Sequence, residues 1–295
     1  MSYVFNTGEA LLALCENEQL PLHEVMLRRE LELTDSSRAA LREEMHKNLT
    51  VMRASIEEGL QAEYRSVSGL SGGDAQKLFS RASGTFMGAD AARAVAAAMA
   101  VVEVNASMGK IVAAPTAGAS GILPGTLLGL AEVRGWKDGS LIDALFAAAA
   151  VGVIIAANAT LAGSEGGCQA ETGSAAAMTA AALAHLSGAK PAVCLNAAAI
   201  ALQNVLGLVC DPVAGLVECP CIKRNALGAA NAMLSADLAL SGVGSIIPFD
   251  ETVDALRTVG RLLPSDLRET ARGGLAATKT AKEITKRLGL SAQAE

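Results

Sequence analysis

The chain has 295 residues and a mass of 29.9 kDa, enough to bury a sizeable core as one large domain or two small ones. Its net charge of −6 and pI near 5.3 argue against nucleic acid as the main partner, because phosphate binding needs a basic patch. Hydrophobic residues make up 51% of the chain and aromatic residues only 3%. Since Ala favours helices and strands favour aromatic and β-branched residues, we expect an all-α fold.

The cysteines and the N-terminus bear on the compartment. Residues 1–6 contain no basic start and no apolar signal core, so secretion is not expected. The six cysteines are spaced irregularly, unlike the disulfide framework of a small secreted protein. The sequence therefore predicts a cytoplasmic protein whose thiols stay reduced and available to metal.

The polar N-terminal segment, about residues 1–65, is expected to be helical and to serve as a scaffold or partner surface. Its apolar residues recur at steps of three and four and form one stripe: Leu41, Met45, Leu49, Met52, Ile56 and Leu60. Thr34 or Asp35 is a candidate N-cap for this helix. The remainder, about residues 66–295, would carry the site, and the absence of a linker or repeat favours a single domain.

Gly- and Ser-rich breaks divide the rest of the chain into helices. Two of them, 66–73 and 83–88, precede a helix starting near Asp74 and an Ala-rich helix over 90–106. The longest break is 107–121, and later breaks fall at 163–167, 187–190, 210–221 and 241–248. Asp74, Asp250 and Ser265 are candidate helix caps.

The stretch 144–157 is almost wholly apolar and lies between Asp143 and Asn158. It is shorter than the roughly 20 apolar residues that span a membrane. A helix that is hydrophobic on all sides is typical of a protein interior, and we interpret this stretch as a buried helix.

The loop 115–121, Pro-Thr-Ala-Gly-Ala-Ser-Gly, leads into a predicted helix. Free backbone N–H groups at such a helix start can hold a carboxylate, although a loop of this kind can also be a simple tight connection. It contains neither a Gly-Lys-Ser/Thr phosphate loop nor a dinucleotide fingerprint.

Cysteine is the most informative residue type in the chain. Cys15 and Cys194 lie among apolar neighbours and are assigned to packing, whereas Cys168, Cys210, Cys219 and Cys221 lie at breaks between helices. Thiolates ligate iron–sulfur clusters, which normally take four. Three ligands would leave one iron free to act as a Lewis acid. The spacings are 42 residues from Cys168 to Cys210 and 11 from Cys210 to Cys221. They do not show whether these cysteines bind a cluster or pack in the core, nor whether Cys219 or Cys221 would be the third ligand.

Histidine and glutamate offer weaker signals. His23 and His46 are expected to be solvated, and His185 to lie at the end of an Ala-rich helix. Glu165 and Glu171 bracket Cys168. A buried carboxylate there could act as acid or base, but we favour the interpretation of Glu171 as an ordinary first-turn residue of its helix.

Three segments give the chain a specific resemblance. They are 108–118 (Met-Gly-Lys-Ile-Val-Ala-Ala-Pro-Thr-Ala-Gly), 167–171 (Gly-Cys-Gln-Ala-Glu), and 210–225, which runs from Cys-Asp-Pro-Val-Ala-Gly-Leu-Val to Pro-Cys-Ile-Lys-Arg-Asn. The sequence resembles the iron–sulfur-dependent L-serine dehydratases, specifically the α chain of the two-chain type, over essentially its whole length.

The resemblance implies a [4Fe–4S] cluster held by Cys168, Cys210 and Cys221, with Cys221 preferred because it follows Pro and precedes Arg-Asn. It also implies an all-helical domain around a central buried helix, for which 144–157 is the candidate. The implied reaction converts serine to pyruvate and ammonia, with the open iron binding the hydroxyl and carboxylate of the substrate and a base removing the Cα proton. Six residues of the polar loops are candidate substrate contacts: Ser68, Lys110, Thr116, Gly118, Ser120 and Asn225.

The resemblance also implies a partner. Single-chain members carry a further domain with a Ser-Ser-His-Thr-x-Gly-Pro stretch, which this chain lacks, and can end in a cysteine, whereas this chain ends Ala-Gln-Ala-Glu. We expect a separate β chain that supplies the missing segment, including a catalytic histidine. The alternatives are a cluster-dependent L-cysteine desulfidase, a pyridoxal phosphate dehydratase, whose lysine and phosphate-loop motifs are absent, and a non-catalytic helical scaffold.

Overall fold

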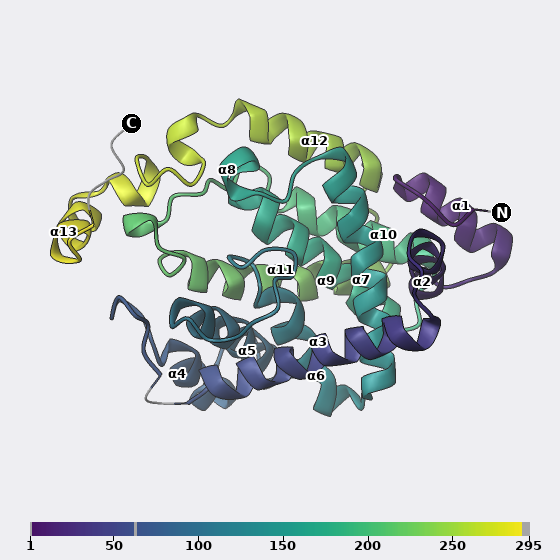
Figure 1. The fold of residues 1–295 in the computed structure, drawn as a ribbon, viewed down its shortest axis with the longest axis horizontal. Coiled ribbons are helices and arrows are strands. Elements are labelled where there is room, and N and C mark those ends of the chain that lie inside the picture. The colour runs from purple at the N-terminus through teal and green to yellow at the C-terminus, as the bar shows by residue number, and fades with distance from the viewer. Residues whose placement is uncertain (1, 62–63, 291–295) are drawn as a thin grey trace.

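The computed structural model describes residues 2–61 and 64–290, and helices dominate it (Figure 1). Strand-like pairing in this part of the chain is limited to an isolated parallel bridge between Cys210 and Arg268. The predicted all-α fold is confirmed. The α-helices are α1 (Gly8–Glu18), α2 (Leu22–Leu33), α3 (Arg38–Gly59), α4 (Asp74–Ser80), α5 (Ala89–Ala106), α6 (Ile122–Arg134), α7 (Asp138–Asn158), α8 (Gly163–Gly166), α9 (Ser174–Leu186), α10 (Pro191–Gln203), α11 (Cys221–Leu240), α12 (Phe249–Leu262) and α13 (Lys279–Arg287).

Short helical turns complete the backbone. The turn η2 (Gln169–Gly173) is π-helical and continues directly into α9. The other turns are 3₁₀-helical: η1 (Ala82–Gly84), η3 (Val213–Gly215), η4 (Ser265–Leu267) and η5 (Gly274–Ala277). The predicted breaks agree with these bounds, except that 163–166 forms the single-turn helix α8.

Helices α7 and α9 form the centre of the molecule (Figure 1). The residues expected to form a buried helix, 144–157, lie within α7, which is longer than expected at 21 residues. By length and composition α7 could cross a membrane, but 67% of its most apolar window is buried inside the protein, as in a core helix. Helix α9 is buried more completely still, since every residue from 174 to 184 is buried. Ala packing all around α9 lets α7, α10 and α11 approach it closely.

Glycine brings α5 and α6 into backbone contact. A Cβ atom added at Gly125 would lie 2.2 Å from the backbone N of Ala98, and one at Gly129 would lie 2.6 Å from the Cα of Ala94. No larger residue fits without separating the helices. Because α6 follows the loop 107–121 directly, this contact also fixes the end of that loop.

The structure corrects the predicted helix caps. Ser37, rather than Thr34 or Asp35, caps α3 and accepts from the N–H of Ala40 at 3.2 Å. Asp74 is the first residue of α4, and Gly73 holds the N-cap position. The two predictions miss the N-cap by two or three residues at α3 and by one residue at α4, because several small residues near a helix start can take this role.

The last two predicted caps have other functions. Asp250 lies inside α12, and its carboxylate accepts from the N–H groups of Gly8 and Glu9, at 2.6 and 3.0 Å. It therefore stabilises the start of α1, 241 residues away, as an anion at a helix N-terminus. Ser265 begins the turn η4, whereas α13 is capped by Thr278.

His23 is not solvated as predicted. It is half-buried on α2, and its Nδ1 lies 3.0 Å from Nε2 of His185 on α9. His46 on α3 is also half-buried.

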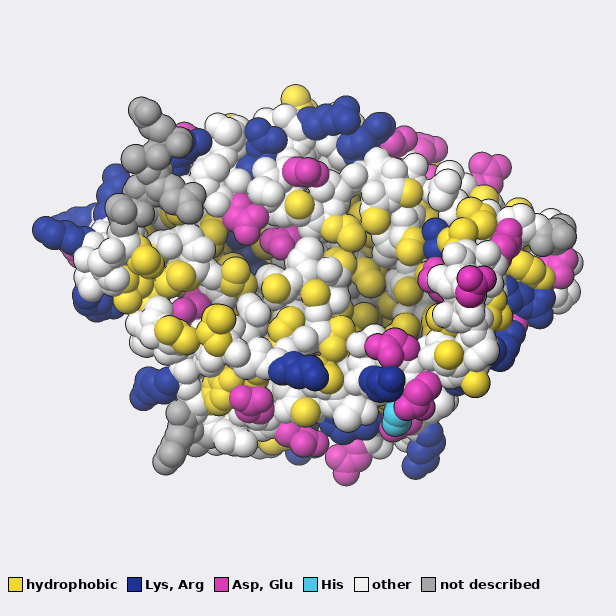
Figure 2. All heavy atoms as spheres, in the orientation of Figure 1, with side chains coloured by type: hydrophobic (Ala, Val, Ile, Leu, Met, Phe, Trp, Pro, Cys, Tyr) yellow, Lys and Arg dark blue, Asp and Glu magenta, His cyan; other side chains and the backbone are white. Residues whose placement is uncertain are grey.

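Figure 2 shows one face of the molecule, on which Lys and Arg side chains are scattered among Asp and Glu toward the edge instead of gathering into one patch.

Candidate functional site

The three predicted ligand cysteines occupy three separate segments. Cys168 lies between α8 and η2, Cys210 in the segment that joins α10 to α11, and Cys221 at the first residue of α11. The exposed fractions of Cys168 and Cys210 are 5% and 4%, and Cys221 is partly buried. By contrast, Cys15 and Cys194 lie in the main hydrophobic core, as expected for packing residues.

The chain turns sharply just before Cys168. Gly167 has a φ of +76°, and a Cβ there would lie 2.6 Å from Cδ1 of Leu263 and 2.9 Å from the carbonyl oxygen of Leu208. Glycine is the residue that tolerates this conformation and this contact. The N–H of Gln169 donates to the same Leu208 carbonyl at 2.9 Å, so the Cys168 segment is held against the segment that leads to Cys210.

The three thiols share one electrostatic environment. Burial raises the pKa of all three, that of Cys221 to about 12, and the neighbouring Cys168 raises the pKa of both Cys210 and Cys221 further. A charged group shifts the pKa of another appreciably only when the two lie within several ångströms in a poorly solvated site. Residues 42 and 11 apart in the sequence are thus brought to one place. Cys219 is half-buried and precedes a cis peptide bond to Pro220.

Glu171 joins this group from the turn η2. A Cβ added at Gly163 would lie 2.7 Å from Oε2 of Glu171 and 3.2 Å from Sγ of Cys210, and one at Gly118 would lie 3.3 Å from Oε1. The carboxyl group therefore lies between the loop 107–121 and α8, on the side of Cys210. Burial raises its pKa, and Glu269 raises it further.

The hydroxyl of Thr116 faces the same space. It lies close enough to Glu171 to lower the pKa of that carboxyl, yet Oγ1 of Thr116 is buried and has no partner with hydrogen-bond geometry. A buried hydroxyl without a partner costs free energy, and such an atom at a site is available to a bound molecule. Gly118, also a predicted contact, is half-buried beside it.

The other predicted contacts make bonds within the protein. The buried Ser120 donates to the carbonyl of Ala117 at 2.8 Å, and Ser68 donates to the buried carboxylate of Glu218 at 2.6 Å. Asn225 is fully buried, and its amide bonds to the loop 107–121 and to Cys221. Lys110 is exposed. The roles proposed for these residues in substrate binding remain predictions.

The structure also reveals polar residues that the sequence did not single out. Oγ1 of Thr172 lies 3.0 Å from Sγ of Cys168, and the side chain of Gln169 bridges the N–H of Gly207 and the carbonyl of Leu256. Arg224 and Asp211 form an ion pair of 2.7 Å whose side chains are only 12% and 4% exposed. The available signal was that Asp211 directly follows Cys210 and that Arg224 follows Cys221 by three residues.

The donor set suits a cluster better than a single ion. No group of three His, Cys, Asp or Glu side chains in residues 2–61 and 64–290 is arranged to hold one metal ion. One ion with Zn–S bonds near 2.3 Å would draw its sulfurs together, whereas a cluster of several irons separates its thiolate ligands. Three thiols that affect one another's pKa without being drawn around a single point are compatible with the second case.

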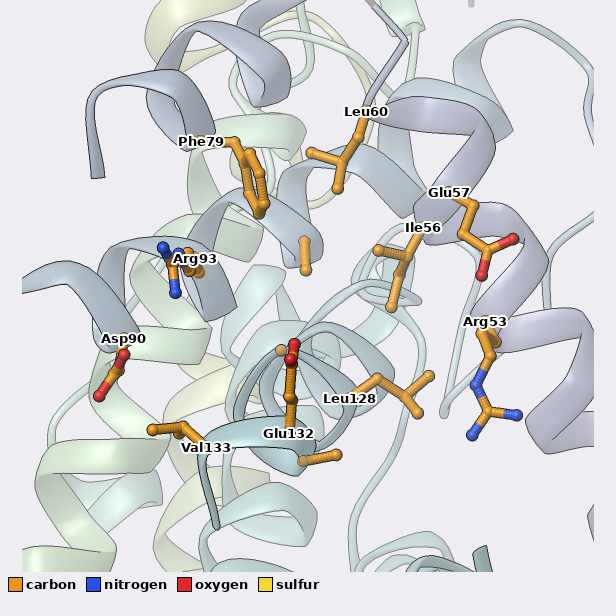
Figure 3. Close-up of a pocket in the computed structure, with 13 residues that line it drawn as sticks. Arg53, Ile56, Glu57, Leu60, Phe79, Asp90, Arg93, Leu128, Glu132 and Val133 are labelled. Atoms are coloured by element: carbon orange, nitrogen blue, oxygen red, sulfur yellow. The ribbon is translucent and has the colours of Figure 1, made fainter. Parts of the chain in front are cut away.

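A large groove lies elsewhere. It has a volume of about 930 Å³ and lies between α3, α4, α5 and α6 (Figure 3). Figure 3 shows Glu132 pointing into it, with Phe79 and Leu60 on the facing wall. None of its lining residues is a cysteine. The groove therefore shares no lining residue with the cysteine site.

Fold and site together define an all-α protein with a buried polar site lined by three cysteines. Residues 17–276 match the family described as Serine dehydratase alpha chain, and the chain belongs to this family. It is 45% identical over 287 residues to the probable L-serine dehydratase, alpha chain, of Bacillus subtilis, covering 97% of this chain and 95% of that protein. It is 42% identical over 287 residues to the L-serine dehydratase, alpha chain, of Peptoniphilus asaccharolyticus, covering 95% of this chain and 97% of that protein.

A third relative is longer. The L-serine dehydratase 2 of Escherichia coli is 44% identical over 181 residues, which cover 61% of this chain and 40% of that protein. The aligned part therefore accounts for less than half of the longer relative.

Proposed function

We propose that this chain is the catalytic α chain of an L-serine dehydratase, which converts L-serine to pyruvate and ammonia. Family membership and the names of the relatives support the substrate. We further propose that Cys168, Cys210 and Cys221 hold a [4Fe–4S] cluster. The observation that carries this second proposal is the convergence of three thiols from separate segments into one buried site, where they act on each other's pKa.

A cluster with one iron free of protein ligands supplies a Lewis acid that assists the departure of hydroxide, a poor leaving group. The residues of this chain bind and orient the substrate. The half-buried loop at Thr116 and Gly118 has an unpartnered hydroxyl for the substrate's polar groups, and Asn225 holds that loop against Cys221. Lys110 and Ser120 on the same loop, and Ser68 on the loop 66–73, are further proposed contacts.

Glu171 is placed to hold or move a proton at its carboxyl group. The side chain is mostly buried and lies between Gly118 and Gly163, beside Cys210. An ordinary first-turn carboxylate would instead point to solvent, as the exposed Glu165 does where it accepts from Thr160. Position therefore favours a role for Glu171 in proton transfer.

We propose that a separate β chain completes the enzyme. The relatives that match this chain over nearly their whole length are named alpha chains, and the longer relative carries additional residues outside the aligned part. Full activity should therefore require co-expression with the β chain. Full turnover of serine by the α chain alone, with its cluster rebuilt anaerobically, would contradict this requirement.

Iron and sulfide analysis of anaerobically reconstituted protein tests the cluster. We expect about four of each per chain, with large losses in Cys168→Ser, Cys210→Ser and Cys221→Ser. Cys219→Ser is the matched control, two residues from Cys221, and should retain both elements. Wild-type protein free of iron and sulfide would contradict the proposal, as would equal losses in Cys219→Ser and Cys221→Ser.

The substrate is tested separately. With the β chain present, turnover of serine, threonine and cysteine should be compared at matched concentrations. Preference for serine is the expected result, and a strong preference for cysteine would indicate a desulfidase.

A further inference from the structure

Arg224 connects segments that carry the cysteines. It lies on α11, one turn after Cys221, and its side chain is only 12% exposed. Its Nη1 donates to the carbonyl of Val209 and its Nη2 to Oδ1 of Asp211, both at 2.7 Å. These two acceptors flank Cys210 on either side. A single guanidinium therefore ties the start of α11 to the segment that carries Cys210.

The segment that carries the third cysteine, Cys168, packs against the residues that Arg224 bonds. A Cβ at Gly167 would lie 3.7 Å from the Cα of Val209, and the N–H of Gln169 donates to the carbonyl of Leu208 at 2.9 Å. Because the site is buried, a fixed positive charge there is poorly screened. Arg224 is thus bonded to the segment of Cys210, against which the segment of Cys168 packs, and it shares α11 with Cys221.

Asp211 fixes the orientation of the guanidinium. Its second oxygen, Oδ2, accepts from the N–H of Leu275 at 2.7 Å. Gly274 has a φ of +57°, and a Cβ there would lie 2.3 Å from Oδ2 of Asp211. The carboxylate is therefore held from two sides, by Arg224 and by the C-terminal segment.

The backbone of Cys210 is held by the same C-terminal segment. Its N–H donates to the carbonyl of Leu267 at 2.8 Å, and its carbonyl accepts from the N–H of Glu269 at 2.7 Å. Cys210 is therefore fixed along its backbone by residues 267–269 and on both flanks by Arg224.

We propose that Arg224 is a positioning residue that holds the three cysteines in their ligand arrangement before any cluster is present, and that its charge offsets that of the thiolates once they bind iron. The second part of this proposal, that the charge of Arg224 offsets the charge of the thiolates, rests on the proposed function. The planar fork of arginine can bond two acceptors at once while facing a third group, which the single ammonium of lysine cannot reproduce.

Two substitutions separate geometry from charge. Arg224→Lys keeps the charge and loses the fork, and Arg224→Gln loses both. Arg42→Lys, in the ion pair with Asp143 remote from the cysteines in sequence, is the matched control. In the apoprotein, we expect faster hydrogen exchange at the amide of Cys210 in both Arg224 variants, with an unchanged cooperative unfolding transition and no effect of Arg42→Lys.

Protein reconstituted with its cluster tests the second part of the proposal, the role of the Arg224 charge. We expect iron release to a chelator to become about 10- to 100-fold faster in both variants, as for other residues that orient metal ligands. The reduction potential of the cluster should become more negative in Arg224→Gln, because a positive charge that favours the reduced state is lost, and should change less in Arg224→Lys.

The outcomes are distinguishable. Wild-type protein that takes up no iron or sulfide would overturn the cluster proposal, while exchange at Cys210 would still decide whether Arg224 orders the apoprotein. Wild-type rates of exchange and iron release in both variants would overturn the role of Arg224. Unfolding of Arg224→Lys as an apoprotein would also overturn it, because Arg224 would then be a general determinant of the fold.

Discussion

The side-chain amide of Asn225 donates to the carbonyl oxygen of Gly118 at 2.7 Å, although 107 residues separate them. The same nitrogen donates to the carbonyl of Cys221 at 2.9 Å, and Oδ1 accepts from the N–H of Gly121 at 3.0 Å. Asn225 is fully buried, and its amide is therefore used entirely within the protein. It fastens the loop 107–121 to the helix that carries Cys221.

This relationship predicts a large effect of Asn225→Asp. A carboxylate cannot donate to the carbonyls of Gly118 and Cys221, so both acceptors lose their partner in a buried site. We expect a loss of about 1–3 kcal/mol in the free energy of unfolding, measured by urea denaturation of the apoprotein, and a higher KM for serine. Asn17→Asp, at an exposed position on α1, changes the net charge equally and is the control. Equal stability of the two variants would contradict the clamp.

The sequence predicted the helical architecture well because its signals are strong and local. Ala-rich runs and Gly-rich breaks located α5 to within one residue and the buried part of α7, although α7 begins six residues earlier than predicted. The caps were predicted poorly, because a cap depends on which of several polar residues the chain brings to the helix end. Asp250 illustrates this, since its carboxylate caps α1 from a position inside α12.

The site was harder to predict from physical signals alone. Spacing could not place Cys168 beside Cys210, because their proximity depends on the sharp turn at Gly167 and on the packing of the intervening helices. Nor could it show that Glu171 is buried and Glu165 exposed, since both are glutamates within three residues of Cys168. Burial is decided by the fold around α9, which the local sequence does not encode.

The different settings of these two glutamates give a second prediction. Glu171→Gln should lower kcat for serine by about 100-fold or more, because an amide keeps the shape of the carboxyl group but cannot exchange a proton. Glu165→Gln should leave kcat nearly unchanged. Iron content, measured in both variants, separates a loss of proton transfer from a loss of the cluster. Equal kcat values in the two variants would show that Glu171 has no such role.

Close packing of α5 on α6 gives a third prediction. Gly125→Ala places a methyl group 2.2 Å from the backbone of Ala98, so the helices must separate. We expect destabilisation of about 1–3 kcal/mol or more, with a lower melting temperature. Gly139→Ala is the matched control on α7, where an added Cβ meets nothing within 4 Å. There the substitution should be neutral or stabilise by up to about 1 kcal/mol.

The pair His23–His185 should make the fold sensitive to acid. Burial lowers the pKa of both histidines, that of His185 to about 4, and the adjacent His23 contributes to the lowering at His185. Nearby charges act in both directions. Asp143, 3.8 Å from Nε2 of His23, and Glu24 favour protonation of His23, whereas Arg42 and Arg38 oppose it.

The direction of the effect follows from where the proton binds. Between pH 6.5 and about 4 the unfolded chain protonates His185 and the folded protein does not, so acid favours unfolding. The stabilisation is fully present above pH 6.5 and is lost as the pH falls toward 4. One pKa unit corresponds to about 1.4 kcal/mol, and with partial exposure allowed for we expect a loss of about 2–3 kcal/mol.

Urea denaturation of the apoprotein at a series of pH values measures this loss of stability. His185→Gln should flatten the profile in this window, whereas His46→Gln should leave its slope intact. A wild-type profile that is already flat between pH 4 and 6.5 would show that the buried pair accepts a proton without cost.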